Sequence, residues 1–348
     1  MLGLVPPWAR GEPFDDNPPS ASRVNRFVEA ARPRTLPAAV TPVIVGTAAA
    51  LRPIGDIHLD RAVLALVVAL SLQVAVNYAN DLFDGISGVD TADRTGPRRA
   101  VASGLVTPRE MKIATAAALG VAAAAGLVLA VLVGWELLLV GALAILATLG
   151  YSGGKRPYAS RGFGEVSVFV FFGVVATVGS AYVQDGVLHA VALLASFPVG
   201  FLAVSLLVIN NLRDIPTDAV AGKRTLAVRL GEAGTRRLYQ GLVVASLVGV
   251  VVVAAVVPGW WPLLGLLAAP LALSPLRLAA TAPLGRELIP VLEATGRVQL
   301  LLGIGLAVGL ALTPLLGPDG GVLLGWLAAP PAAGLASLSV VVSAGPVG

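Results

Sequence analysis

The stretch AVLALVVALSLQVAVNYANDLFD, residues 62–84, indicates what kind of protein this is. It is almost entirely apolar up to Val76, and it then ends in two asparagines and two aspartates. A run of about 20 apolar residues is long enough for an α-helix to cross the hydrocarbon layer of a bilayer, which is about 30 Å thick. We therefore predict a membrane-spanning helix whose last turns carry carboxylates.

The composition extends this prediction to the whole chain. Of its 348 residues, 56% are hydrophobic and 13% are charged, and the mean hydropathy is +0.85. Soluble domains carry about 25% charged residues, so an ordinary soluble protein is excluded. The sequence has no cysteine, which excludes disulfides and thiolate chemistry, and its two histidines are too few for a multi-histidine metal site. The net charge of +4 comes without a basic stripe interleaved with aromatic residues, so nucleic acid is not an expected partner.

The apolar pattern recurs along the chain and predicts nine membrane-spanning helices, and hence an all-α polytopic membrane protein. The expected spans are residues 34–51, 62–80, 113–133, 136–152, 165–183, 188–209, 238–258, 260–279 and 298–316. They lie within an expected membrane domain of residues 23–316. Residues 1–22, rich in Pro, Asp and Ser, are expected to be a disordered tail. Residues 317–348 are an apolar tail rich in Pro and Gly, and the sequence leaves open whether it forms a tenth span.

The basic residues predict the orientation of these spans. All but two of the 24 Lys and Arg residues lie in the N-terminal segment or in alternate connections, and the two exceptions are Arg52 and Arg61. Because basic residues are retained on the cytoplasmic side, this asymmetry predicts a cytoplasmic N-terminus.

Two similar polar clusters end the second and the sixth predicted spans, with Asn and Asp four residues apart in each. The first cluster is Asn77, Asp81 and Asp84, and the second is Asn210, Asp214 and Asp218. Residues three and four apart share one face of a helix, although Pro216 predicts a break between Asp214 and Asp218. Both clusters follow even-numbered spans, so we expect them on the cytoplasmic side, facing one cavity. Their recurrence suggests two four-helix halves of similar plan, with one further helix.

The four aspartates of these clusters are the predicted metal ligands. An Asp within a membrane span costs about 2.5–3.5 kcal/mol, and several carboxylates in one pocket repel each other unless a cation lies among them. Oxygen ligands without His or Cys favour a hard cation, and Mg²⁺ prefers one or two carboxylates together with a substrate phosphate. The predicted cofactor is therefore Mg²⁺.

Basic residues on the same side provide candidates for binding that phosphate. They are Arg94 in the loop after the first cluster, Lys155 and Arg156 in YSGGKRPYASRG, and Lys223 in AGKRT. Carboxylates for a metal and bases for phosphate around one membrane cavity predict a diphosphate ester with a lipid tail as substrate. Most basic loop residues only determine topology, and Tyr151 is also interpretable as an anchor at the membrane interface.

Four motifs at these positions resemble those of the UbiA-type intramembrane aromatic prenyltransferases. They are NDLFD (80–84), RDIPTD followed by GKRT (213–218 and 222–225), YSGGK (151–155) and ARPRTLPAAVTPVIVGT (31–47). The resemblance runs from about Phe27 to about Leu316 and is strongest to the branch that acts on 1,4-dihydroxy-2-naphthoate. One departure concerns the acceptor, because relatives that prenylate 4-hydroxybenzoate usually have a third Asp where Gly88 stands here.

The resemblance implies a fold of nine helices around a cavity and a Mg²⁺-dependent reaction. A polyprenyl group would pass from polyprenyl diphosphate to dihydroxynaphthoate with loss of CO₂, giving demethylmenaquinone in the plasma membrane. The implied catalytic residues are Asp81, Asp84, Asp214, Asp218, Lys155 and Tyr151. The implied diphosphate-binding residues are Asn77, Asn210, Arg94, Lys155, Arg156 and Lys223.

Other functions stay open at this point. Another aromatic acceptor, such as 4-hydroxybenzoate or homogentisate, or a lipid precursor, would use the same machinery. A cation-coupled transporter also places acids inside a helix bundle, but it would need them near the middle of the membrane. Here the acids cluster at one end of the predicted spans. A purely structural membrane protein would leave the paired motifs without a purpose.

Overall fold

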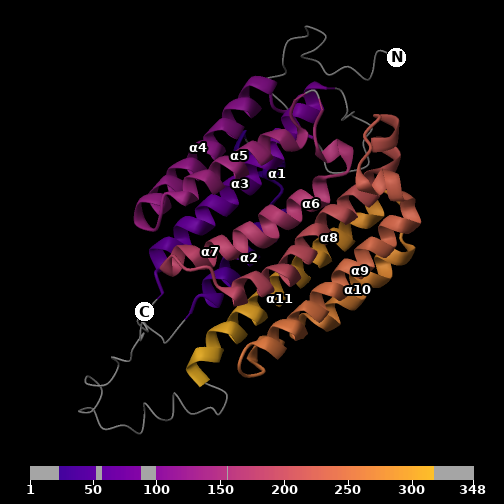
Figure 1. Ribbon diagram of the computed structural model, residues 1–348. Helices are drawn as coiled ribbons and strands as arrows, with labels where there is room; N and C mark the ends of the chain where they lie inside the picture. Colours follow the sequence, from indigo (N-terminus) through magenta and orange to yellow (C-terminus); the bar gives the residue numbers. More distant parts are fainter. Residues whose placement is uncertain (1–22, 52–56, 88–98, 155, 317–348) are drawn as a thin grey trace, which may run out of the picture.

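A computed structural model describes residues 23–51, 57–87, 99–154 and 156–316. These residues form helices and connecting turns, and no β-strand occurs among them (Figure 1). The expected all-α fold is thus confirmed for this part of the chain. The two predicted tails, residues 1–22 and 317–348, lie outside the described residues.

Among the residues that the structure describes, seven helices are long and apolar enough to cross a membrane, and two shorter apolar helices accompany them. The seven are α3 (Leu59–Ile86), α4 (Pro108–Leu132), α6 to α7 (Gly164–Asp185), α8 (Ala190–Val220), α9 (Leu226–Val256), η6 to α10 (Trp261–Thr281) and α11 (Ile289–Leu316), which follows the short turn η7 (Arg286–Leu288). The two shorter helices are α2 (Pro37–Ala49) and α5 (Glu136–Ser152). Each of the nine predicted spans overlaps one of these nine helices.

The helices pack as two groups with shared elements between them (Figure 1). In the first group, α3 packs along α4 and contacts α5. In the second group, α9 packs against α8 and contacts η6 and α10. Helices α2 and α11 pack against each other, and both contact α8. The largest buried apolar cluster lies among α2, α8, α9, α10 and α11, so the second group is the more densely packed one.

Several boundaries differ from the sequence prediction. Helix α3 continues to Ile86 and α8 continues to Val220, so both acidic motifs are helical throughout. The predicted break at Pro216 is wrong, because α8 runs through this residue. Pro216 lies near the end of α8, where a proline removes a backbone donor with only a few residues left to disturb. An unexpected amphipathic helix, α1 (Arg23–Ala31), precedes α2 and packs against α3.

The fifth span is not a regular α-helix. It consists of α6 (Gly164–Val168), a π-helical segment η5 (Phe169–Val175) and α7 (Ala176–Asp185). π-Helical turns are rare and are frequent at functional sites. Within η5, Gly173 lies directly against Gly200 of α8, since a Cβ on Gly173 would be 2.7 Å from the Gly200 Cα. The absence of side chains at this crossing lets the two backbones approach closely.

We predict that Gly173→Ala lowers the free energy of unfolding by about 1–3 kcal/mol, because the added methyl group would push η5 away from α8. Gly120→Ala on α4 is the matched control, since a Cβ there would meet no atom within 4 Å. Both variants are compared with the parent protein by denaturant titration in mixed micelles. Equal stability of Gly173→Ala and the parent would contradict the packing described for this crossing.

Candidate functional site

An ion pair connects the two acidic motifs. The Lys223 Nζ, in the turn that follows α8, lies 3.0 Å from the Asp84 Oδ2 on α3. Arg99 also approaches this carboxylate, with Nη2 at 3.8 Å from Oδ2. Because Asp84 lies near the end of α3 and Lys223 lies in the turn directly after α8, this contact holds the ends of α3 and α8 together. The prediction that both motifs lie at the same end of the bundle is confirmed.

Asp81 positions the chain that follows the first motif. Its carboxylate is 1% exposed and accepts hydrogen bonds from two backbone amides, from Ala100 N to Oδ2 at 3.0 Å and from Val101 N to Oδ1 at 2.9 Å. Two amide donors stabilise the charged form of a buried carboxylate. Asp81 therefore fixes the start of residues 99–106 over the end of α3.

The second motif is neutralised by a residue of its own helix. Arg213 donates to both carboxylate oxygens of Asp214, from Nε to Oδ1 at 2.7 Å and from Nη2 to Oδ2 at 2.8 Å. Asp218 is buried one turn further along, and its backbone carbonyl accepts a hydrogen bond of 2.9 Å from Lys223 N. This bond sets the turn that carries the Lys223 side chain toward Asp84.

The carboxylates do not form one ligand cluster. Within the described ranges, no three His, Cys, Asp or Glu side chains are close enough together to hold a metal ion. The reason is that Asp81 is held by backbone amides, whereas Asp214 is paired with Arg213. The donor set nevertheless fits Mg²⁺, which is commonly held by one or two carboxylates and completed by substrate phosphates and water. The role of the four aspartates as metal ligands stays a prediction.

The two asparagines of the motifs have separate structural partners. Asn77 Nδ2 donates to the Ala31 carbonyl at 2.8 Å and to Thr35 Oγ1 at 3.3 Å, and Gln73 Nε2 also donates to Thr35 Oγ1 at 3.1 Å. Asn77 therefore ties α3 to the turn between α1 and α2. Asn210 Nδ2 donates to the Leu206 carbonyl of its own helix at 3.0 Å. Neither contact tests the predicted role in binding diphosphate.

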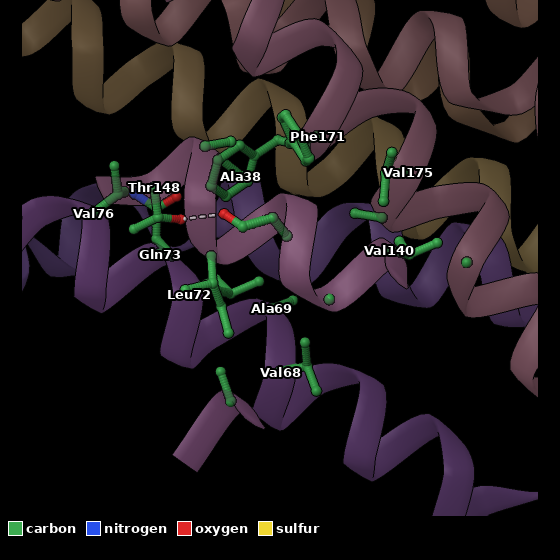
Figure 2. Close-up of a pocket in the computed structure, with 18 of the residues that line it drawn as sticks. Ala38, Val68, Ala69, Leu72, Gln73, Val76, Val140, Thr148, Phe171 and Val175 are labelled. Carbon is green, nitrogen blue, oxygen red and sulfur yellow. Dashed lines mark hydrogen bonds between the residues drawn. The ribbon is translucent and has the colours of Figure 1, made fainter. Parts of the chain in front are cut away.

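A cavity of about 430 Å³ extends from this polar end into the apolar interior. Its polar rim includes Arg32, Asn77, Asn80, Tyr151 and Asn210. The deeper walls are almost entirely apolar, and Figure 2 shows part of them, with Val68, Leu72 and Val76 from α3, Val140 from α5, and Phe171 and Val175 from η5. A cavity with one polar end and a long apolar interior suits an amphiphile with a charged head and a hydrocarbon tail.

The remaining predicted residues have different placements. Tyr151 lines the cavity, and its ring meets that of Tyr158 edge to face with centroids 5.5 Å apart. Arg156 is exposed. Lys155 and Arg94 lie outside the described residues, so the structure gives no position for their side chains.

Sequence reasoning missed a buried acid in the fifth span. Glu165, in the first turn of α6, accepts a hydrogen bond of 2.9 Å from Asn211 Nδ2 on α8, next to the second motif. It also missed Arg213 and Arg32, although Arg213 is inside the second motif. These residues could have been found from their charge, because an ionisable side chain within an apolar span is energetically costly and usually marks a functional site.

Comparison with known proteins shows which family has this sequence pattern and fold. Residues 39–287 match the UbiA prenyltransferase family. The chain is 48% identical over 289 residues to 1,4-dihydroxy-2-naphthoate octaprenyltransferase of Mycobacterium tuberculosis, covering 82% of this chain and 97% of the relative. The chain belongs to the UbiA prenyltransferase family. It is also 38% identical over 301 residues to the protein of that name from Escherichia coli, covering 84% of this chain and 97% of the relative.

Solved structures agree with the fold of this UbiA family member. The apo structure of a UbiA homologue from Aeropyrum pernix has a TM-score of 0.57 at 20% identity and covers 82% of this chain and 98% of its own. A UbiA homologue from Archaeoglobus fulgidus bound to GPP and Mg²⁺ has a TM-score of 0.57 at 18% identity and covers 82% and 99%. The expected polytopic prenyltransferase fold is thus confirmed.

We predict that Lys223→Met lowers the free energy of unfolding by about 1–3 kcal/mol, because it leaves the buried Asp84 without its nearest cation. Lys223→Arg keeps the charge and should retain most of the stability, and Lys112→Met, at an exposed position of α4, is the control. The measurement is denaturant unfolding without added metal. If Lys223→Met were no less stable than Lys112→Met, the ion pair would not hold the two motifs together.

Proposed function

We propose that this protein transfers a polyprenyl group from polyprenyl diphosphate to 1,4-dihydroxy-2-naphthoate, with loss of CO₂, to give demethylmenaquinol, the hydroquinone form of demethylmenaquinone. The observation that carries this proposal is the similarity, along almost the whole length of the relatives, to proteins named 1,4-dihydroxy-2-naphthoate octaprenyltransferase. The cavity supports it independently, because its polar end and apolar interior match a diphosphate and its tail.

The polar end of the cavity would bind the diphosphate. A divalent cation held by Asp81, Asp84, Asp214 and Asp218, with Mg²⁺ as the first candidate, would supply positive charge to the leaving group. Lys223 and Arg99 already lie at this end beside Asp84. They would neutralise negative charge that develops as the allylic C–O bond breaks and its electron pair leaves with the diphosphate. Lys155, Arg156 and Arg94 are proposed to add to this charge from the surrounding loops, with Asn77 and Asn210 at the rim.

The apolar interior would protect the reactive carbon. Breaking the allylic bond leaves an electron-deficient carbon that water would quench, so water must be excluded. The walls below the rim consist mainly of aliphatic and phenylalanine side chains, with a few polar ones such as Gln73, Thr148 and Ser180, and offer water few hydrogen-bond partners. Tyr151 also lines the cavity, and its ring would contact the allylic group.

The acceptor ring would then complete the reaction. The ring carbon that bears the carboxylate uses a π-electron pair to form the new C–C bond to the allylic carbon. The carboxylate leaves as CO₂, and the electron pair of the broken C–C bond restores the aromatic ring. These steps need no oxidant or reductant and give the hydroquinone form of the product, demethylmenaquinol, so the chain has only to bind, orient and exclude water; conversion to the quinone is a separate two-electron oxidation outside this reaction.

The other functions considered from the sequence are less well supported. The family membership favours an enzyme over a cation-coupled transporter, and the described acids of the two motifs lie at one end of the bundle. We further propose that the protein resides in the plasma membrane with a cytoplasmic N-terminus, because the basic residues are distributed so unevenly between the two sides.

We predict that Asp81→Asn lowers prenyl transfer by about 100-fold or more, since it removes a charge at the diphosphate end while keeping an acceptor oxygen for one of the two backbone amides. Removal of divalent metal with EDTA should abolish transfer, and Mg²⁺ should restore it. Asp60→Asn, exposed at the other end of α3, is the control. Near-normal transfer by Asp81→Asn in the presence of Mg²⁺ would contradict the proposed site.

The acceptor is tested with a panel. Purified protein in lipid vesicles receives octaprenyl diphosphate and one of dihydroxynaphthoate, 4-hydroxybenzoate or homogentisate, and the products are identified by mass. We expect a decarboxylated prenyl product with dihydroxynaphthoate alone. A product with another acceptor and none with dihydroxynaphthoate would replace the proposed substrate.

A further inference from the structure

A buried carboxylate lies at the start of the fifth span, and the proposed reaction does not use it. Glu165 is 6% exposed, and its Oε1 accepts a hydrogen bond of 2.9 Å from Asn211 Nδ2 of α8. An ionisable side chain within a membrane span is costly and usually has a function. Glu165 lies behind the cavity wall rather than in it, so it can affect the reaction only through its neighbours.

The hydrogen bond docks the start of α6 on α8 beside the cavity. On α8, Asn211 follows Asn210, which lines the cavity. On α6, Glu165 follows Gly164, and a Cβ on Gly164 would be 3.4 Å from Cδ2 of Leu207, another lining residue. Leu207 and Asn211 are four residues apart and thus share one face of α8. The backbone of α6 is therefore held against this face by the hydrogen bond and by the contact at Gly164.

Gly164 also provides the space for the hydroxyl group of Tyr151. A Cβ on Gly164 would lie 3.2 Å from the Tyr151 hydroxyl oxygen, so any side chain at this position would press on the phenol. The Glu165 carboxylate is close enough to interact electrostatically with the same phenol. The tip of Tyr151 thus rests against the part of α6 that Glu165 docks on α8.

A second tyrosine supports the ring of Tyr151. The rings of Tyr151 and Tyr158 meet edge to face with centroids 5.5 Å apart, an arrangement in which their relative orientation matters. Tyr158 OH donates to the Ala147 carbonyl at 2.7 Å and is hydrogen bonded to Ser167 Oγ of α6 at 2.9 Å. Burial raises the pKa of the Tyr158 phenol, so the hydroxyl keeps the proton that this bond needs. Both supports of Tyr151 therefore depend on where α6 lies.

We propose that Glu165 is a positioning residue, whose hydrogen bond with Asn211 docks α6 so that the Tyr151 ring is held against the allylic carbon of the donor. This inference rests on the proposed function, since it requires an allylic cation in the cavity. A cation is stabilised by an aromatic ring only over the face of the ring and at short range, so a displaced ring stabilises it less. A displaced ring also admits water, which would capture the cation as a prenyl alcohol and release a proton.

The test compares variants that keep or lose the hydrogen bond. Glu165→Gln keeps an acceptor oxygen for Asn211, whereas Glu165→Leu removes it. Full-length proteins in lipid nanodiscs receive octaprenyl diphosphate and dihydroxynaphthoate, and the prenyl alcohol is quantified beside the prenylated product. We expect Glu165→Leu to lower kcat about tenfold or more, with the KM for the donor within about twofold of the parent value. The share of prenyl alcohol should rise in Glu165→Leu, and Glu165→Gln should match the parent.

A double-mutant cycle shows whether the effect passes through Tyr151. In a Tyr151→Leu background, Glu165→Leu should lower kcat by less than about twofold, because the ring that it positions is gone. Replacement of both Glu165 and Asn211 by Leu leaves no unpaired donor between the helices, so this variant tests the loss of the bond in a folded protein. Independent losses in the cycle, or an equal loss in Glu165→Gln and Glu165→Leu, would overturn the proposal.

A label at Tyr151 separates this inference from the proposed function. A meta-fluorotyrosine incorporated at this position gives a fluorine NMR resonance that reports on the surroundings of the ring and needs no substrate. We expect Glu165→Leu to shift or broaden this resonance, whereas Glu165→Gln and the control Glu287→Leu, at an exposed position of η7, should leave it unchanged. If the parent transfers no prenyl group, the proposed function fails, while the resonance still tests the positioning. An unchanged resonance in the folded Glu165→Leu variant would contradict it.

Discussion

The fold depends on balancing buried negative charge at one end of an apolar helix bundle. A carboxylate moved out of water loses several kcal/mol of hydration unless donors or cations replace it. Each motif meets this requirement differently: Asp81 uses two backbone amides, Asp84 uses Lys223, and Asp214 uses Arg213. These contacts also fix the ends of α3 and α8 and the turns that follow them. The same contacts therefore compensate the buried charges and determine how the backbone is arranged at the polar end of the cavity.

The two groups of helices differ in packing: the second group is densely filled, whereas the first group surrounds most of the cavity. The group around α8, α9 and α11 is filled by side chains and joined by buried hydrogen bonds, such as the one between Tyr239 and Thr295 at 2.6 Å and the one from Ser246 to the Pro198 carbonyl at 2.8 Å. The cavity lies instead among the helices of the first group and the adjoining faces of α7 and α8. A rigid second group allows the first group to remain hollow without losing its arrangement.

The sequence was sufficient to predict the spans but not the contacts between them. Each span carries its own hydropathy signal, so all nine were located from composition along the chain. Helix α1 was missed because it is short and amphipathic, and the run through Pro216 was missed because tertiary packing overrides a local rule. The partners of Asp81 and Asp84 lie 19 and 139 residues away, at Ala100 and Lys223, and no local pattern specifies such pairs. The position of both motifs at the same end of the bundle was predictable, because both follow even-numbered spans.

The π-helical segment η5 has a consequence for how the fifth span tolerates change. Its hydrogen bonds reach five residues along the chain, so the winding is wider here than in α6 and α7. A π-helical turn holds about one residue more than an α-helical turn, so η5 can lose one residue by returning to regular winding and leave the side-chain directions of α7 unchanged. Each residue of a regular α-helix advances the side-chain direction by about 100°, so removal of one residue from α7 before Gly179 would instead turn Gly179 out of the cavity and Tyr182 away from Glu136. The angular phase of α7, rather than its composition, thus determines which side chains the lipid tail would meet.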